Sequence, residues 1–265
     1  MTHDIMELPR TIPHQPEITQ KKFVFAFEEG DGKNKQLLGG KGANLCEMTQ
    51  IGLNVPPGFV ISTEACLTFL KDENNNLPEK LMAEVKRQMK IVEASTGKLF
   101  GDAEKPLLVS VRSGSALSMP GMMDTILNLG LNAQTLRGLI KQTKNERFAY
   151  DAYRRFIQLY GKVALGVPDE KFDHAFAGVK VKAGVKDDTG LNAADLKEIS
   201  EQFLNVVRDH TGKKFPEDVF EQLEIAIKAV FNSWMGKRAV DYRREFGITP
   251  QMANGTAVRR VVTIT

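Results

Sequence analysis

The stretch at residues 107–124, LLVSVRSGSALSMPGMMD, joins an apolar run to a loop that is small, flexible and almost uncharged. Residues 107–111 have the composition of a short buried strand, and Arg112 stands at its end. Ser, Gly and Ala follow the arginine, and Pro120-Gly121 is a turn signal. The stretch therefore predicts a strand that brings a single arginine to the edge of a flexible loop.

This loop has the chemistry of a mobile flap over a polyanion. The small residues 113–118 offer hydroxyls and accessible backbone amides, while Arg112 can make a fork-shaped contact with a phosphate. Met119, Met122 and Met123 can pack on a flat apolar ring such as a purine. The alternative is an ordinary surface loop whose methionines fill the core beneath it.

A second glycine-rich segment, LLGGKGANL at residues 37–45, precedes a helical pattern. Bare amides and the positive end of a helix dipole attract anions, and Lys41 adds a mobile charge. The pattern is not a Walker A loop, and Gly39 and Gly40 could instead form a turn beside a solvated Lys41. Together, however, the two segments predict a nucleotide polyphosphate site, which needs carboxylates for Mg²⁺ to be complete.

Composition is that of a globular protein with no strongly charged partner. The chain has 265 residues, and 36 Lys and Arg against 33 Asp and Glu leave a net charge of +3, which argues for neither a nucleic-acid nor a membrane partner. No apolar run approaches the roughly 20 residues that span a bilayer, and no secretory signal is recognisable. Cys46 and Cys66 are interpreted as buried small hydrophobes. We expect a cytoplasmic protein.

Hydrophobic periodicity divides the chain into parts of different character. Strands are predicted at 22–27, 55–62 and 107–111, and helices at 41–52, 63–71, 78–98, 147–164, 193–211 and 216–235. The expected organisation is a loose arm (1–21), an α/β phosphate-binding lobe (22–132), a helical region (133–245) and a final segment (246–265).

Several segments resemble the N-terminal portion of the pyruvate, phosphate dikinase family over about residues 22–258. They are FVFAFEEGDG, LLGGKGANLCEM, GLNVPPGFVISTEAC, LLVSVRSGSALSMPGMMDTILNLGLN, RFAYDAYRRFIQLYG, AVFNSW and RAVDYRREFGI. The resemblance implies an α+β or α/β fold: an incomplete ATP-grasp-type nucleotide-binding lobe with a large helical subdomain. Residues 246–265 would begin the second ATP-grasp lobe, with a divergent tail after Val258.

The resemblance also implies an activity. Enzymes of this family interconvert ATP, pyruvate and phosphate with AMP, phosphoenolpyruvate and pyrophosphate. The nucleotide-binding region passes a pyrophosphoryl group to a histidine on a separate domain, and a pyruvate-binding barrel completes the reaction. The implied partners are thus ATP, the phosphohistidine domain and the barrel, within a homodimeric full-length enzyme. Mg²⁺ is the implied cofactor, and its ligands are expected outside this chain.

Site residues are carried over by matching motifs. The lysine of GGKG and the arginine of SVRSG, which contact the ATP phosphates in the family, match Lys41 and Arg112. The covering loop and the GTAV motif add further ATP-binding candidates, namely Ser113, Gly114, Gly121, Met123, Asp124 and Thr256. No metal ligand is assigned to the chain.

The phosphorylated histidine of the family has no counterpart among His3, His14, His174 and His210. We therefore expect this chain alone to bind ATP weakly and not to turn over. Two alternatives remain: a segment of a pyruvate, water dikinase, and a non-catalytic interaction module that keeps the fold. The arginine pairs of YRRF (153–156) and YRRE (242–245) are interpreted as ion-paired helix faces rather than phosphate clamps.

Overall fold

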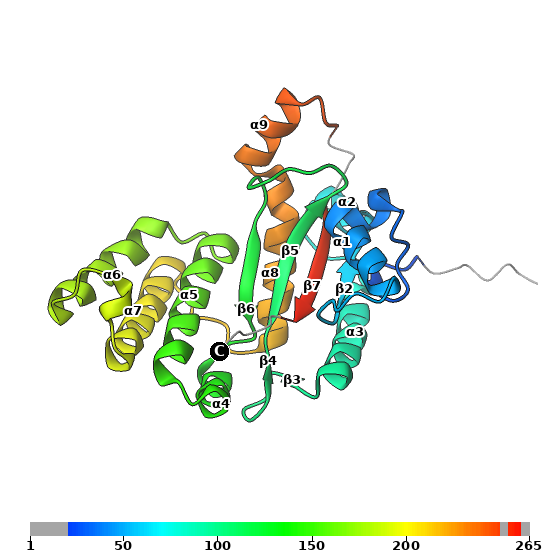
Figure 1. The fold of residues 1–265 in the computed structure, drawn as a ribbon. Helices are drawn as coiled ribbons and strands as arrows, with labels where there is room; N and C mark the ends of the chain where they lie inside the picture. Colours follow the sequence, from blue (N-terminus) through cyan, green and yellow to red (C-terminus); the bar gives the residue numbers. More distant parts are fainter. Residues whose placement is uncertain (1–20, 250–253, 261–265) are drawn as a thin grey trace, which may run out of the picture.

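The computed structural model describes residues 21–249 and 254–260. Its centre is a five-stranded sheet in the order β1-β2-β7-β5-β6 (Figure 1). The strands are β1 (Val24–Ala26), β2 (Gly58–Ile61), β5 (Val109–Ser115), β6 (Thr125–Leu129) and β7 (Asn254–Arg260). All neighbouring strands in this sheet are antiparallel, so the fold is of the α+β kind.

The strand β7 lies in the middle of this sheet. Val258 pairs with Phe59 of β2 on one side and with Val111 of β5 on the other. We expected residues 246–265 to begin a separate second lobe, but the part of that segment that is described completes the first sheet. Pairing across more than 140 residues of chain leaves no local signal in the sequence.

Alternate residues of the central strands face opposite layers, as the pleat requires. On one face, Val60 packs with Leu38, Ala43 and Cys46 of α1 (Lys35–Gln50). On the other face, Val111 and the alternate residues of β2 and β7 join the main hydrophobic core. The main core is covered by α2 (Thr63–Lys71), α5 (Glu146–Ala164) and α8 (Val219–Asn232), and Figure 1 shows α8 running along the sheet.

The helical region shares its core with the sheet. A continuous cluster of buried side chains runs from Val111 in β5 and Ile126 in β6 to Phe156 in α5, Phe203 in α7 and Phe231 in α8. The other helices of the described region are α3 (Leu81–Thr96), α4 (Ala133–Thr143), α6 (Asp169–Ala183), α7 (Ala193–Thr211) and α9 (Lys237–Glu245). The helical region therefore packs directly onto the sheet.

Helix ends follow their sequence signals closely. The helix α3 ends at Gly97, whose φ of 63° is the left-handed conformation that glycine adopts readily at this position. The helix α8 begins after Asp218, whose side chain accepts from the amides of Phe220 and Glu221. The strands β3 (Leu99–Phe100), β6 and β7 were not predicted, and the predicted strand at 107–111 is divided between β4 (Pro106–Leu107) and β5.

The two expected ends of the chain are mostly outside the described residues. This applies to residues 1–20 of the expected arm and to 261–265 of the expected divergent tail. Within the described residues, no helix is long and apolar enough to cross a bilayer.

Candidate functional site

Three glycines bring the start of α1 into contact with the sheet. Gly39 interrupts the helix with φ 69° and ψ 161°, a conformation that only glycine adopts without strain. A Cβ atom on Gly39 would lie 1.7 Å from the carbonyl oxygen of Gly114, and one on Gly255 would lie 2.5 Å from that of Leu38. The helical turn that carries Lys41 therefore rests on the backbones of β5 and β7.

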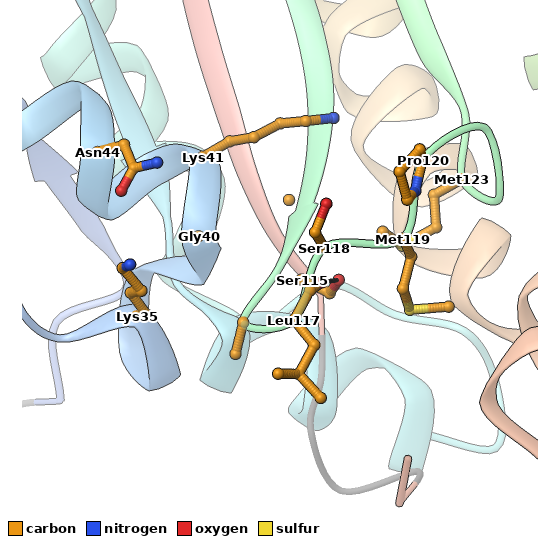
Figure 2. A pocket seen from close by; sticks show the side chains of 12 residues that line it. Lys35, Gly40, Lys41, Asn44, Ser115, Leu117, Ser118, Met119, Pro120 and Met123 are labelled. Atoms are coloured by element: carbon orange, nitrogen blue, oxygen red, sulfur yellow. Dashed lines mark hydrogen bonds between the residues drawn. The ribbon is translucent and has the colours of Figure 1, made fainter. Parts of the chain in front are cut away.

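Lys41 and Arg112 share this face of the sheet. A Cβ on Gly114 would lie 2.9 Å from the Cβ of Lys41, so the Gly114 position of β5 faces α1. Arg112 is two residues earlier on the same strand and faces the same way. In Figure 2 the Lys41 side chain extends across β5. The structure thus brings together the two cations that the sequence singled out.

The electrostatics of the pair are those of cations without a counter-ion. Burial, and then the charge of Arg112, lowers the pKa of Lys41, while burial, and then the charge of Arg259, lowers the pKa of Arg112. The Nε atom of Arg112 is buried and has no hydrogen-bond partner. Among the described residues, no ion pair includes either side chain. An anion bound between them would supply the missing partner.

A cavity of about 550 Å³ opens beside Lys41 (Figure 2). One wall is α1 and the other is the loop after β5. The lining residues are Lys35, Gly40, Lys41, Asn44, Gly114, Ser115, Ala116, Leu117, Ser118, Met119, Pro120 and Met123. Of the ATP-binding candidates, Lys41, Gly114 and Met123 line the cavity, whereas Arg112 lies outside its lining. Lys35 and Asn44 line it but had not been singled out from the sequence. Asn44 is three residues after Lys41 on a helix, and residues at this spacing lie on the same face. The spacing could therefore have predicted that Asn44 lines the same cavity.

The loop at 115–124 is attached to α9 on the side away from α1. Arg238 donates from Nη2 to Oδ1 of Asp124 at 2.9 Å and from Nη1 to the carbonyl of Gly121 at 3.2 Å. Met119 is buried and belongs to a small apolar cluster with Trp234 and Ala239. Asp124 is thus engaged in orienting the loop, and Gly121 and Asp124 do not line the cavity.

Ser113 and Thr256 face the opposite side of the sheet from Lys41. They are directly paired across β5 and β7, and each lies two residues from a strand residue of the main core, Val111 and Val258. Their side chains are buried, and both hydroxyl oxygens lack a hydrogen-bond partner. The structure therefore does not bring these two hydroxyls to the cavity. Successive residues of a strand face opposite sides of the sheet. The apolar Val111 therefore indicated that Ser113 faces the core with it and that Arg112 faces the other side.

The arginine pairs behave as expected for ion-paired helix faces. Arg154 pairs with Asp151 and Asp188, Arg155 pairs with Asp151, and Arg244 pairs with Asp241. Arg243 differs because it donates to the carbonyl of Trp234 and lies over the indole ring. None of these side chains lines the cavity beside Lys41.

The described residues do not fit a metal ion. Residues 21–249 and 254–260 contain no group of three or more His, Cys, Asp or Glu side chains that could hold one. The cavity beside Lys41 is lined by no carboxylate, and the acidic residue closest in sequence, Asp124, is paired with Arg238. No step is therefore assigned to Mg²⁺ on these residues.

An antiparallel sheet that carries cations without an acidic partner in the described part of the chain, beside a loop of small residues, has the charge and the accessible amides that a multiply charged anion would require. The family described as "Pyruvate phosphate dikinase, AMP/ATP-binding domain" matches residues 35–96 and 73–264. The chain belongs to this family. Because the match reaches residue 264, the expectation that the likeness ends at Val258 was wrong.

Individual relatives carry the same name. The chain is 62% identical over 235 residues to "Pyruvate, phosphate dikinase" of Entamoeba histolytica, a match that covers 89% of this chain and 26% of that protein. It is 50% identical over 245 residues to "Pyruvate, phosphate dikinase 1, chloroplastic" of Arabidopsis thaliana, covering 91% and 25%. Identity to the protein of Clostridium symbiosum is 46% over 242 residues, covering 91% and 28%. The chain thus spans about a quarter of the length of these relatives.

Proposed function

We propose that this chain provides ATP-binding residues to a pyruvate, phosphate dikinase of the ATP-grasp type. Lys41 and Arg112 bind the phosphate groups of ATP, and the loop at 115–124 closes one side of the nucleotide pocket. The observation that carries the proposal is that both cations lie on one face of the sheet without any acidic partner among the described residues.

The residues on the two walls of the cavity suit different parts of ATP. Lys41 lies at the α1 wall, where its charge can reach a phosphate, and Met119 and Met123 lie at the opposite wall, where they can contact an apolar ring. Arg112 suits phosphate better than a lysine does, because its planar fork can donate two parallel hydrogen bonds. Gly114 leaves its backbone open to a close approach by phosphate oxygens.

The rest of the reaction belongs to the proposal for the whole protein. A histidine domain and a pyruvate-binding barrel would accept the pyrophosphoryl group and form phosphoenolpyruvate, in a cytoplasmic, homodimeric enzyme with Mg²⁺. The names of the relatives support this activity. Because residues 21–249 and 254–260 provide cations but no group of metal ligands, we expect this chain alone to bind ATP weakly, with Kd above about 10 µM.

Calorimetric titration with Mg-ATP tests the proposal. The variants K41A and R112A should each weaken binding about tenfold, the usual effect of losing a hydrogen bond to a charged group. The control is R137A, which removes an exposed arginine from α4. Unchanged affinity in K41A and R112A would contradict the phosphate assignment, and a low-micromolar Kd for the unmodified chain would contradict the expectation of weak binding.

A further inference from the structure

The structure assigns a third phosphate-binding residue, Arg259, to the same site. We propose that Lys41, Arg112 and Arg259 together bind a chain of linked phosphates, as in a nucleoside triphosphate or inorganic tripolyphosphate. This inference rests on the proposed function, because it extends the site formed by Lys41 and Arg112. The sequence did not single out Arg259, which lies just beyond the GTAV motif.

The register of the central strands places Arg259 beside Arg112. Arg112 is directly opposite Ala257, and Arg259 is two residues further along β7, opposite Ser110. The two arginines are therefore diagonal neighbours across adjacent strands, with Cβ atoms about 7 Å apart. Residues two or four apart on a strand face the same side of the sheet. Arg112 is two residues from Gly114 and Arg259 is four residues from Gly255, so both arginines lie on the face that contacts α1.

Charge distribution argues against a structural role for Arg259. Within the described residues it forms no ion pair, and its charge acts on Arg112, another cation. By contrast, Arg154, Arg155 and Arg244 each pair with an aspartate. Three cations on one sheet face repel one another, and a bound polyanion would reverse that repulsion.

The spacing of the three cations indicates a ligand with more than one phosphate. Lys41 reaches the face from α1, Arg112 from β5 and Arg259 from β7, so the positive charge extends across two strands. Arg112, whose Nε is buried and without a partner, connects the other two, because its charge acts on Lys41 and the charge of Arg259 acts on it. A linear polyphosphate presents several charged groups at intervals and can contact all three side chains.

Inorganic tripolyphosphate is the appropriate probe, because it tests the phosphate contacts without the nucleoside. The full chain and its variants R259A, R259K, R112A and R137A are titrated by calorimetry, and their melting temperatures are measured with and without the probe. We expect R259A to weaken tripolyphosphate binding about tenfold, and R259K to weaken it less because lysine keeps the charge but not the fork. R137A should stay within about twofold of the unmodified chain, since loss of a distant exposed charge is screened.

Melting temperatures without the probe separate binding from folding. R259A should melt at or above the temperature of the unmodified chain, because it removes a repulsive charge and breaks no ion pair among residues 21–249 and 254–260. A markedly lower melting temperature of R259A would show a structural role and overturn the inference. If R112A weakens tripolyphosphate binding while R259A matches R137A, the inference fails and the proposed function stands. If the unmodified chain does not bind tripolyphosphate at all, both fail.

Discussion

Lys41 lies in surroundings that disfavour its charged form in the absence of a bound anion. It remains accessible to solvent, yet its surroundings and the neighbouring Arg112 favour the neutral amine and lower its pKa below the usual 10.5. A bound phosphate would favour the ammonium form and raise that pKa again. Under the proposed assignment, binding of ATP would therefore be coupled to uptake of a proton by Lys41 at alkaline pH.

This coupling predicts that, as pH rises in the alkaline range, ATP affinity and the Lys41 contribution to folding stability change in opposite directions. Between the lowered folded pKa of Lys41 and 10.5, the unfolded chain binds more protons, so the Lys41 contribution to stability rises with pH. ATP affinity should fall over the same interval, because the amine loses its charge. Calorimetric titrations at several alkaline pH values check this, and K41R should flatten the profile. An affinity independent of pH in the unmodified chain would contradict the assignment of Lys41.

Gly39 is the residue on which the position of Lys41 depends most directly. Its φ of 69° and ψ of 161° are strained for any other residue, and a Cβ there would overlap the carbonyl oxygen of Gly114. We expect G39A to lower the free energy of unfolding by at least about 2 kcal/mol and to weaken ATP binding. Chemical denaturation measures the first effect.

The matched control for G39A is G178A. Gly178 lies within α6, and a Cβ there would meet no atom within 4 Å. Alanine favours a helix over glycine by about 1 kcal/mol, so G178A should be neutral or stabilising. A G39A variant as stable as G178A would show that the kink at Gly39 is not needed to seat α1 on the sheet.

At the scale of elements, the loop at 115–124 is positioned by α9 as much as by its own sequence. Arg238 at the start of α9 binds both Asp124 and the Gly121 carbonyl, and Tyr242 donates to the Ser118 carbonyl at 3.5 Å. These contacts hold the side of the loop opposite α1. The loop is therefore better described as a wall fixed from one side than as a free flap.

Loss of the Arg238 contacts should loosen this wall. The Arg238 side chain is 65% exposed, so water screens its pair with Asp124, and R238A is expected to cost only roughly 0.5 kcal/mol of stability. Hydrogen exchange of the amides at 121–124 should become about twofold faster, with exchange in α5 unchanged. The control is R208A, since Arg208 forms a similarly exposed pair with Asp209 on α7. Equal exchange in R238A and R208A would show that the loop keeps its position without α9.

Local elements were more predictable than their assembly. Helices with clear periodicity, such as α5 and α7, lie where the pattern predicted them. The strand predicted at 107–111 is present as β5, but it continues through Arg112 to Ser115, so Arg112 lies within the strand and not at the edge of the loop. The strand β6 was missed, and it includes Asn128 at a φ of 56°, which breaks a regular strand pattern. The strand β7 was missed as part of the first sheet because both of its partners are distant in sequence.

The candidate site was predictable to a similar extent. Lys41 and Arg112 were found from charge placed beside small residues, and the structure brings them together. Ser113 and Thr256 were grouped with them, although strand alternation turns their side chains to the other face. Arg259 could not be found from the sequence because it comes close to Arg112 only through the pairing of β5 with β7, which the sequence did not predict.

At the scale of the whole molecule, the sheet and the helices share one core. The cluster that contains Val111 and Ile126 also contains Phe156, Phe203 and Phe231, so separation of the helices would expose apolar surface on both sides. We therefore expect a single cooperative thermal transition, with equal calorimetric and van 't Hoff enthalpies. Two resolved transitions would instead support the expected division into a lobe at 22–132 and a helical region at 133–245.

The central claim is that Lys41 and Arg112 bind the phosphate groups of ATP. Its most direct test is nuclear magnetic resonance of the arginine Nε–H groups, with the Arg112 signal assigned from R112K. We predict that the Arg112 Nε–H signal moves as Mg-ATP is added, because that buried donor gains a charged acceptor, while the Arg137 signal stays in place. An Arg112 signal unmoved at saturating Mg-ATP would contradict the claim.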